Sequence, residues 1–364
     1  MKYTTKYLLN AKNIQALPQA IKPVYEIETH SPSNIALVKY WGKRTPQLPQ
    51  NPSLSFTLSN SKTFMKIRYL RRNQPDTKIS AKLFFEGKRN ALFEKRIEKY
   101  LHGIEIFLPF IKFFDLEIHS KNTFPHSSGI ASSASSMSAL ALNLCHLENQ
   151  LYRSLEDHDA FLQKASFLSR LASGSASRSI YHSFVIWGEC EAFEGSTDEF
   201  AIPLSMDIHP SFSRLQDRIL IAASGKKTVS SSAGHRLMEN HPYQYVRYQQ
   251  ARDNTKALLG ILNKGDWKRF AEIVEEEAMS LHALMINSQH PYTLMNDNTW
   301  NIIYRIQDWR RETGLPLTYT LDAGPNVHLI FPKEIEKDID QMIKSELKRF
   351  CQDNQVIVDF MAVD

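Results

Sequence analysis

The chain has 364 residues, 42% of them hydrophobic and 23% charged, and this composition excludes a globally disordered protein. A chain of this length usually folds as two domains. The formal net charge is only +5 and is spread along the chain, which suits an anionic small molecule at least as well as a nucleic acid, so we expect no nucleic-acid partner.

Cysteine usage and the N-terminal residues indicate a cytoplasmic protein. Cys145, Cys190 and Cys351 lie far apart without any C-x-x-C pair, so we expect neither a disulfide framework nor a zinc site. The first residues lack the apolar run of a signal peptide, and no stretch approaches the ~20 apolar residues of a membrane helix. We therefore expect no membrane partner.

The first half of the chain is predicted to alternate between strands and helices, after a polar extension at 1–25. Leucines at helical spacing, beginning with Leu140, Leu144 and Leu147, predict a long helix directly after a serine-rich stretch. Alternating apolar residues and short apolar runs predict the strands. The strands are expected near 33–42, 48–59, 64–70, 113–120 and 178–188, and two further helices at 91–101 and 155–172.

The pattern restarts near residue 216 with an apolar strand at 218–224. Helices are expected at 243–262, 266–285, 298–313 and 334–350, and strands at 317–324, 326–331 and 355–363. This order favours an antiparallel sheet with helices on one face. We therefore predict an α+β protein with an N-terminal extension at 1–25, a first domain at 26–215 and a second domain at 216–364.

A serine-rich stretch, FPHSSGIASSASS at 124–136, precedes the long helix. The unpaired N–H groups and the dipole of a helix N-terminus favour a phosphate group, and small residues let it approach closely. Gly129, Ser132 and Ser133 are therefore candidates for phosphate binding, and simple capping of the helix by a serine is the alternative. The stretch is neither a Walker loop nor a Rossmann fingerprint.

A cationic stretch, SPSNIALVKYWGKR at 31–44, places Lys39, Lys43 and Arg44 around an aromatic pair and a glycine. Lys39 comes at the end of an apolar strand, where a long cationic side chain can point into a cleft. Lysines that lie along a surface loop are the alternative.

Two further stretches contain single candidate residues. In TYTLDAGPN, Asp322 sits where a strand meets a turn, and both a catalytic role and closure of the turn explain an aspartate there. In SGSASRS, Arg178 follows several serines and offers a fork for a carboxylate or a phosphate, whereas a surface arginine is the alternative. No H-E-x-x-H or G-x-S-x-G motif occurs, which argues against a protein-bound metal and a serine hydrolase.

Taken together and in order, six stretches resemble the diphosphomevalonate decarboxylases, a branch of the GHMP small-molecule kinases related to galactokinase, homoserine kinase and mevalonate kinase. KYWGK and DAGPN together are specific to this branch, and ASSA belongs to the whole kinase group. The stretches run over about residues 30–331 and read PSNIALVKYWGKR, PSLSFTLS, FPHSSGIASSAS, SGSASRS, KKTVSSSAG and LDAGPN.

The resemblance implies ATP-dependent decarboxylation of (R)-mevalonate 5-diphosphate to isopentenyl diphosphate, the last step of the mevalonate pathway, with ADP, phosphate and CO2 as the other products. It implies the two-domain GHMP kinase fold. The N-terminal domain is then similar to ribosomal protein S5 domain 2, the C-terminal domain is ferredoxin-like, and the active site lies in the cleft between them. The implied cofactor is ATP with the Mg²⁺ that it carries, and homodimers are common in the family.

Roles for individual residues also follow from the resemblance. Asp322 resembles the family's catalytic base for the 3-hydroxyl, Arg178 the residue that holds the substrate carboxylate, and Lys39 the cation that keeps the aspartate ionised. The positions that match substrate-binding residues are Asn34, Tyr40, Lys43, Ser173, Ser175 and Ser231, and those that match the nucleotide loop are Gly129, Ser132 and Ser133.

Several positions depart from the family pattern. His182 and Ser183 replace a pair of glycines after Tyr181, where glycine permits close packing of the backbone. The other departures are Ser177 for cysteine, His126, Ser127 and Ser128 for Thr-Ala-Ala, Ile130 for leucine, and Ser232 for an arginine found in some bacterial members.

Two other functions stay open at the level of sequence. A kinase of the same fold would phosphorylate a mevalonate-like 3-hydroxyl and stop, and it would release no CO2. A binding protein that uses its basic surface on RNA would show a steep dependence on salt. The presence of Lys39, Arg178 and Asp322 together favours the decarboxylase.

Overall fold

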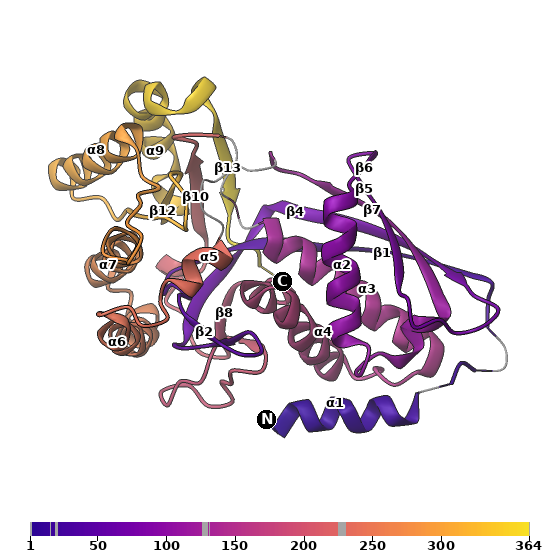
Figure 1. Ribbon diagram of the computed structural model, residues 1–364. Coiled ribbons are helices and arrows are strands. Elements are labelled where there is room, and N and C mark those ends of the chain that lie inside the picture. Colours follow the sequence, from indigo (N-terminus) through magenta and orange to yellow (C-terminus); the bar gives the residue numbers. More distant parts are fainter. Residues whose placement is uncertain are drawn as a thin grey trace.

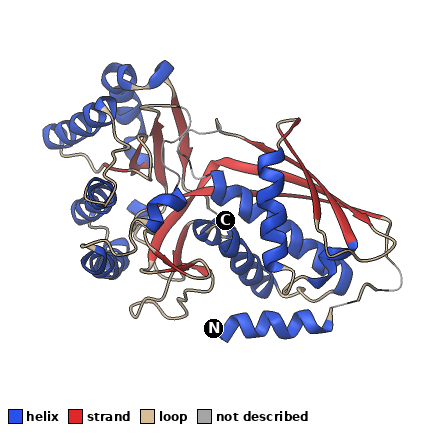
Figure 2. Cartoon of the chain, viewed as in Figure 1, coloured by secondary structure: helices blue, strands red, loops and turns tan. Residues whose placement is uncertain are grey.

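The structure is a computed structural model that describes residues 2–14, 16–18, 21–125, 130, 132–224 and 231–363. The chain forms two halves, each built on a sheet with helices packed against it (Figure 1). Helices and strands are mixed in both halves, so the architecture is α+β as predicted from the sequence (Figure 2).

The first half contains a seven-stranded sheet in the order β6-β5-β7-β4-β8-β9, in which β1 also pairs with β4. Two further short strands, β2 (Lys43–Arg44) and β3 (Leu48–Pro49), pair with each other. The strands of the large sheet are β1 (Val24–Ala36), β4 (Ser53–Arg71), β5 (Ser80–Phe85), β6 (Lys88–Arg89), β7 (Phe114–Asn122), β8 (Phe184–Trp187) and β9 (Ala201–Pro203).

Two strands differ from the sequence-based expectation. β4 is one strand of 19 residues where two were predicted, because the N–H groups of Asn60 and Ser61 in its polar middle donate to the Asp359 carboxylate and keep it extended. β1 ends at Ala36, so Lys39 lies in the loop after the strand and not within it. The N–H groups of Leu37 and Val38 still donate to the carbonyl of Leu54, which holds the start of that loop against β4.

The helices of the first half cover the large sheet, and α3 packs on β1 and β4. Residues 2–13 form a helix where an irregular extension was expected, because Tyr7, Ala11 and Ile14 bury one apolar face against the rest of this half. The helices are α1 (Lys2–Asn13), α2 (Ala91–Ile104), α3 (Ser132–Tyr152) and α4 (His158–Ala172), with short 3-10 turns η1 (Pro109–Phe113) and η2 (Gly174–Ile180).

The second half contains a four-stranded antiparallel sheet in the order β11-β12-β10-β13, with helices packed against it (Figure 1). Its strands are β10 (Leu215–Leu220), β11 (Thr318–Thr320), β12 (Val327–Pro332) and β13 (Val356–Phe360). Its helices are α5 (Ser231–Arg236), α6 (Gln244–Lys264), α7 (Trp267–Ile286), α8 (Asp297–Thr313) and α9 (Glu336–Met342). The 3-10 turns η3 (Pro210–Phe212) and η7 (Gln352–Asn354) also belong to this half.

The single helix predicted at 334–350 is wrong in detail. A 3-10 turn at Lys333–Ile335 precedes α9, and a π turn at Ile343–Leu347 and a 3-10 turn at Lys348–Phe350 follow it. The wider π turn keeps Ile339, Ile343 and Leu347 buried on the side of the sheet, so packing overrides the regular helical repeat.

The C-terminal segment joins the two halves. Besides the contacts of Asp359 with β4, the N–H of Ala362 donates to the carbonyl of Thr57 at 2.8 Å, and Met361 bridges to Leu58. One apolar cluster contains side chains from both halves, among them Phe56 of β4 and Phe270 of α7. The loop after β1 is therefore held against α6 and α7 by a shared core.

Candidate active site

The site is organised around an ion pair between residues that are far apart in the sequence. The Nζ atom of Lys39 lies 3.1 Å from Oδ1 of Asp322. Lys39 is only 1% exposed. The side chain of Asp322, which lies two residues after the end of β11, is 29% exposed. The buried ammonium therefore contacts one oxygen of a carboxylate that is itself partly exposed.

The backbone of Asp322 is fixed by a turn and by α7. The N–H of Gly324 donates to the Asp322 carbonyl at 2.7 Å, and Nε2 of His282, a residue of α7 that is 1% exposed, lies 3.2 Å from the same carbonyl. Since a carbonyl only accepts, His282 donates its Nε2 proton there. Sequence analysis gave His282 no role, because one histidine on an apolar helix face carries no signal of its own.

Burial and ion pairing act on Lys39 in opposite directions. Burial lowers the pKa of Lys39, while the charge and the hydrogen bond of Asp322, and the more distant charge of Glu277, raise it. Nζ also donates to the Ala36 carbonyl at 2.6 Å, which directs the side chain inward. An ammonium at this distance favours the ionised form of a carboxyl group.

Arg178 lies in η2 with its guanidinium buried. Nε donates to Oγ of Ser55 at 3.0 Å and to Oδ1 of Asn34 at 3.3 Å, while Nη1 is buried without a hydrogen-bond partner among the described residues. Burial lowers the pKa of Arg178 to about 10, and the charge of Asp322 opposes this shift. A buried cationic N–H without a partner favours an anionic ligand beside it.

Asn34, which the resemblance predicts to bind substrate, lies against Arg178. Its Oδ1 accepts from the guanidinium, and its Nδ2 donates to the Ser179 hydroxyl at 2.7 Å and to the Ser175 carbonyl at 3.1 Å. With only 3% of its surface exposed, Asn34 orients the arginine and the η2 turn. Its contacts within the described residues are those of a supporting residue.

Aromatic rings form a wall beside the cations. The ring of Tyr40 lies 4.7 Å from that of Trp187 and 4.4 Å from that of His235, and its hydroxyl is buried without a partner among the described residues. Burial raises the pKa of Tyr40. Burial also lowers the pKa of His235 to about 3, so this imidazole is neutral and accepts the Gly42 N–H through Nδ1 at 3.1 Å.

The remaining polar candidates lie near this wall. Lys43 donates to Oε1 of Gln47 at 2.7 Å, and its pKa is lowered by burial and by the charge of Arg236. The hydroxyls of Ser173 and Ser175 are 3.5 Å apart and flank Gly174, which contacts the Tyr40 ring. The two serines therefore flank the residue that packs on the Tyr40 ring.

The serine-rich candidates are only partly within the described residues. α3 begins at Ser132, which is half-buried, and Ser133 is exposed at the same end of the helix. Gly129 lies outside the described residues, as do the departures at His126, Ser127 and Ser128. Ser231 is the first residue of α5, and its side chain, like that of Ser232, lies outside the described part of the chain.

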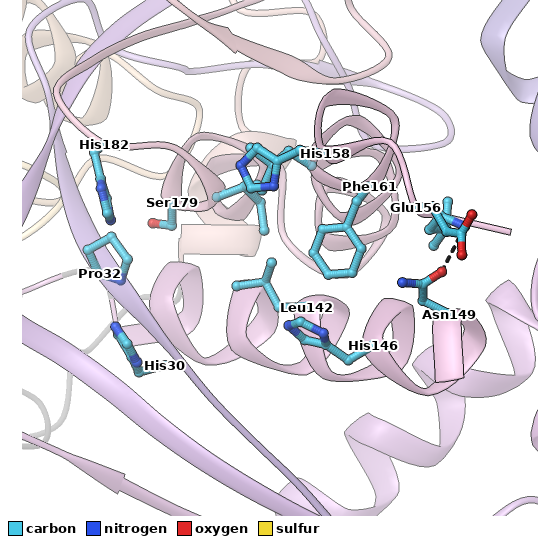
Figure 3. A pocket seen from close by; sticks show the side chains of 13 residues that line it. His30, Pro32, Leu142, His146, Asn149, Glu156, His158, Phe161, Ser179 and His182 are labelled. Atoms are coloured by element: carbon cyan, nitrogen blue, oxygen red, sulfur yellow. Dashed lines mark hydrogen bonds between the residues drawn. The ribbon is translucent and has the colours of Figure 1, made fainter. Parts of the chain in front are cut away.

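The departures at His182 and Ser183 have a visible local consequence. Ser183 adopts a φ of 59°, a left-handed conformation that glycine adopts more readily. His182 lines a cavity of about 410 Å³ together with His30, Pro32 and Phe161 (Figure 3). This cavity includes neither Lys39 nor Asp322, and it shares the elements β1 and η2 with the Arg178 cluster.

The described part of the chain has neither a cluster of metal-binding side chains nor a membrane-spanning helix. No group of three or more histidine, cysteine, aspartate or glutamate side chains is arranged to hold a metal ion. Within the same ranges, no helix is both long enough and apolar enough to cross a membrane.

Comparisons with known proteins cover nearly all of these elements. A diphosphomevalonate decarboxylase-like N-terminal domain matches residues 31–200, and a mevalonate 5-diphosphate decarboxylase C-terminal domain matches residues 218–362. The chain is 33% identical over 342 residues to a diphosphomevalonate decarboxylase of Ganoderma lucidum, covering 88% of this chain and 82% of that protein.

Solved structures agree with the sequence relatives. The crystal structure of mevalonate diphosphate decarboxylase from Staphylococcus aureus matches with a TM-score of 0.77 and 28% identity over 93% of this chain and 96% of that one. A complex of MDDEF with MVAPP, AMPPCP and magnesium shares the fold, with a TM-score of 0.78 and 24% identity over 93% of this chain and 97% of that one. The matching domains and the level of identity show that the chain belongs to the diphosphomevalonate decarboxylase family.

Proposed function

We propose that this protein catalyses the ATP-dependent decarboxylation of (R)-mevalonate 5-diphosphate to isopentenyl diphosphate, the last step of the mevalonate pathway. The observation that carries the proposal is the cluster in which the Asp322 carboxylate faces the Lys39 ammonium at 3.1 Å, beside the buried guanidinium of Arg178, whose Nη1 finds no partner among the residues that the structure describes. A substrate with a carboxylate and a hydroxyl on neighbouring carbons complements this arrangement of one base and two cations.

In the first step, Asp322 orients the tertiary 3-hydroxyl and accepts its proton as the oxygen attacks the γ-phosphoryl group of ATP. Lys39 favours the ionised form of Asp322, which a base requires. Phosphoryl transfer depends mainly on positioning and on stabilisation of charge, and the residues near the hydroxyl supply both. The tertiary hydroxyl thereby becomes a phosphate, which is a much better leaving group.

In the second step, Arg178 holds the substrate carboxylate through Nη1, which has no hydrogen-bond partner among the described residues. The C3–O bond breaks and phosphate leaves with the bonding electrons. The electron pair of the bond between C2 and the carboxyl carbon then forms the C2=C3 double bond, and CO2 departs. Positive charge develops at C3 as phosphate leaves, and the electrons supplied by the substrate carboxylate neutralise it.

The diphosphate and the nucleotide are assigned to the remaining candidates. Tyr40, Lys43 and the hydroxyls of Ser173, Ser175 and Ser231 line the diphosphate end, and Gly129, Ser132 and Ser133 hold the nucleotide at the start of α3. The start of a long helix with exposed and half-buried serines suits phosphate oxygens. Mg²⁺ would arrive with ATP, since this ion prefers phosphate oxygens and water to a dedicated protein cage.

The domain boundaries also stay part of the proposal. We assign residues 26–215 to the nucleotide-binding domain and 216–364 to the ferredoxin-like domain, with the active site between them. We also assign the protein to the cytoplasm, on the basis of its cysteine content.

The deciding experiment measures ADP release in a coupled assay with mevalonate 5-diphosphate, mevalonate and mevalonate monophosphate in parallel. With carboxyl-labelled diphosphate, release of labelled CO2 in step with ADP supports the decarboxylase. ADP formation without CO2 would indicate a kinase that phosphorylates the 3-hydroxyl and stops. Absence of turnover with all three substrates would refute the proposal.

A further inference from the structure

We infer that Glu277 of α7 is a positioning residue for the active site, which holds the Lys39 ammonium in place and supports its charge. This inference rests on the proposed function of Lys39 and Asp322 and adds a residue that the sequence motifs do not include. Its side chain is fully buried, and its carboxylate accepts the backbone N–H of Lys39 at 2.8 Å.

The backbone of Lys39 needs such a partner because it has left the sheet. β1 ends at Ala36, so the N–H and the carbonyl of Lys39 are buried without a ladder partner. Glu277 satisfies the N–H, while Arg247 of α6 and Asn51 donate to the carbonyl at 3.3 and 3.1 Å. Both polar groups of the Lys39 backbone are therefore held by side chains from other segments of the chain.

Glu277 is itself held by a buried network. Nη1 of Arg247 donates to Oε1 of Glu277 at 2.8 Å, and Nδ2 of Asn254 donates to the same oxygen at 2.8 Å. Arg247 and Glu277 are both almost completely buried, so their charges are poorly screened by solvent. The network comes entirely from α6 and α7, in the half of the molecule that also carries Asp322.

One helix therefore fixes both members of the ion pair by their backbones. Glu277 of α7 binds the N–H of Lys39, and His282, five residues further along α7, binds the carbonyl of Asp322. The backbones of Lys39 and Asp322, from which the two charged side chains extend, are thus both held by one helix. A lysine anchored only by its own loop would move whenever the two halves shift relative to each other.

The charge of Glu277 acts on Lys39 as well. The charged groups that act on the Lys39 ammonium are Asp322 after β11 and Glu277 of α7, which raise its pKa, and Arg178 of η2, which lowers it together with burial. Arg247 of α6 binds both Glu277 and the Lys39 carbonyl and partly neutralises Glu277. Removing either partner of the Glu277–Arg247 pair should therefore move the Lys39 pKa, and in opposite directions.

The experiment compares E277Q, R247Q and the E277Q/R247Q double variant with the wild-type chain. Glutamine at 277 can still accept the Lys39 N–H, so E277Q removes mainly the charge. The pKa of Lys39 is followed by ¹³Cε NMR of labelled lysine, with K39R for assignment, and in parallel by the alkaline limb of the pH profile of kcat.

We expect E277Q to lower the Lys39 pKa and the alkaline limb by ~1 pH unit, and R247Q to raise both by a similar amount. The double variant should lie near the wild-type values because it removes both charges. A purely structural role predicts equal losses of stability without shifts of opposite sign, so shifts in the same direction, or none, would overturn the inference.

Two features keep the test decisive. If E277Q fails to fold, the direction of the shift in R247Q and in the double variant still decides, because an unshifted R247Q contradicts a charge effect of Glu277. The NMR titration requires no turnover, so an inactive wild-type chain would refute the proposed function without touching the result for Glu277.

Discussion

Gly174 contacts Trp187 and Tyr40 so closely that a Cβ atom at this position would lie 2.6 Å from Cη2 of Trp187 and 2.8 Å from Cε1 of Tyr40. We expect Gly174→Ala to lower the free energy of unfolding by ~1–3 kcal/mol and to reduce kcat/KM, because Tyr40 must move. Urea unfolding and steady-state kinetics measure both effects.

A matched control for this prediction exists in α6. A Cβ at Gly260 meets no atom within 4 Å, so Gly260→Ala should raise the free energy of unfolding by ~0.5–1 kcal/mol and leave kcat/KM unchanged. Equal behaviour of the two alanine variants would show that the close approach at Gly174 is of no consequence.

The Asp322→Asn variant tests the proposed base. Asparagine preserves the size of the side chain but cannot accept the proton of the 3-hydroxyl, so kcat should fall by ~10²–10⁴-fold while nucleotide binding is retained. Stopped-assay product analysis and calorimetric titration with a non-hydrolysable ATP analogue check the two parts. Asp253→Asn, an exposed change on α6, should leave both unaffected. An active Asp322→Asn enzyme would remove this residue from the role of base.

A comparison of two buried arginines, Arg178 and Arg170, distinguishes a residue that binds substrate from a residue that only stabilises the fold. Nη1 of Arg178 has no partner within the part of the chain that the structure describes, whereas Arg170 donates to the carbonyls of Glu199 and Pro46 at 2.7 and 2.6 Å. We expect Arg178→Lys to lower kcat/KM by about 10-fold or more, because a lysine cannot offer the same fork. Arg170→Lys should mainly lower the free energy of unfolding, by ~1–3 kcal/mol.

The measurement for both arginines is a KM and kcat determination beside thermal unfolding. The assignment of Arg178 to the carboxylate fails if its lysine variant loses stability but keeps wild-type kinetics, as expected for Arg170.

The residues proposed to carry the chemistry are easier to recognise from the sequence than the residues that position them. Short motifs contain Lys39, Arg178 and Asp322, and the residue types of these motifs suit the proposed chemistry. These residues can therefore be singled out from the sequence alone. Glu277 is one of three consecutive glutamates, of which Glu276 is exposed and Glu277 is fully buried. Composition cannot distinguish them, because the choice depends on how α6 and α7 pack.

Packing also explains the errors in the predicted elements. The two predicted strands within residues 53–71 form one strand, because Asp359, almost 300 positions away, binds their polar junction. The helix at residues 2–13 escaped prediction because few apolar residues mark its buried face, which among the described side chains consists of Tyr7 and Ala11 with Ile14 just after the helix. Local patterns determine most helices and strands, whereas contacts between distant segments determine where they end.

The N-terminal helix is expected to stabilise the first half. The Tyr7 ring is 2% exposed and lies 4.7 Å from the ring of Phe167 in α4. Tyr7→Ala should therefore lower the free energy of unfolding by ~3 kcal/mol. Leu9, on the same helix but 55% exposed, is the control, since Leu9→Ala should change it by less than ~0.5 kcal/mol. Chemical denaturation of both variants checks the difference, and equal values would mean that α1 is not docked in solution.

Ser183 stands in a left-handed conformation, with a φ of 59°, at a place where the family pattern has glycine. Its N–H donates to the Ala362 carbonyl at 2.8 Å, so the C-terminal segment fixes this conformation. Ser183→Gly should raise the free energy of unfolding by ~0.5–1 kcal/mol, because relief of the backbone strain exceeds the conformational entropy that glycine adds to the unfolded chain. Ser213→Gly, at a φ of −72°, offers no such relief and should lower it by a similar amount. Thermal unfolding of the two variants decides, because a loss of stability in both would mean that the backbone at Ser183 is not strained.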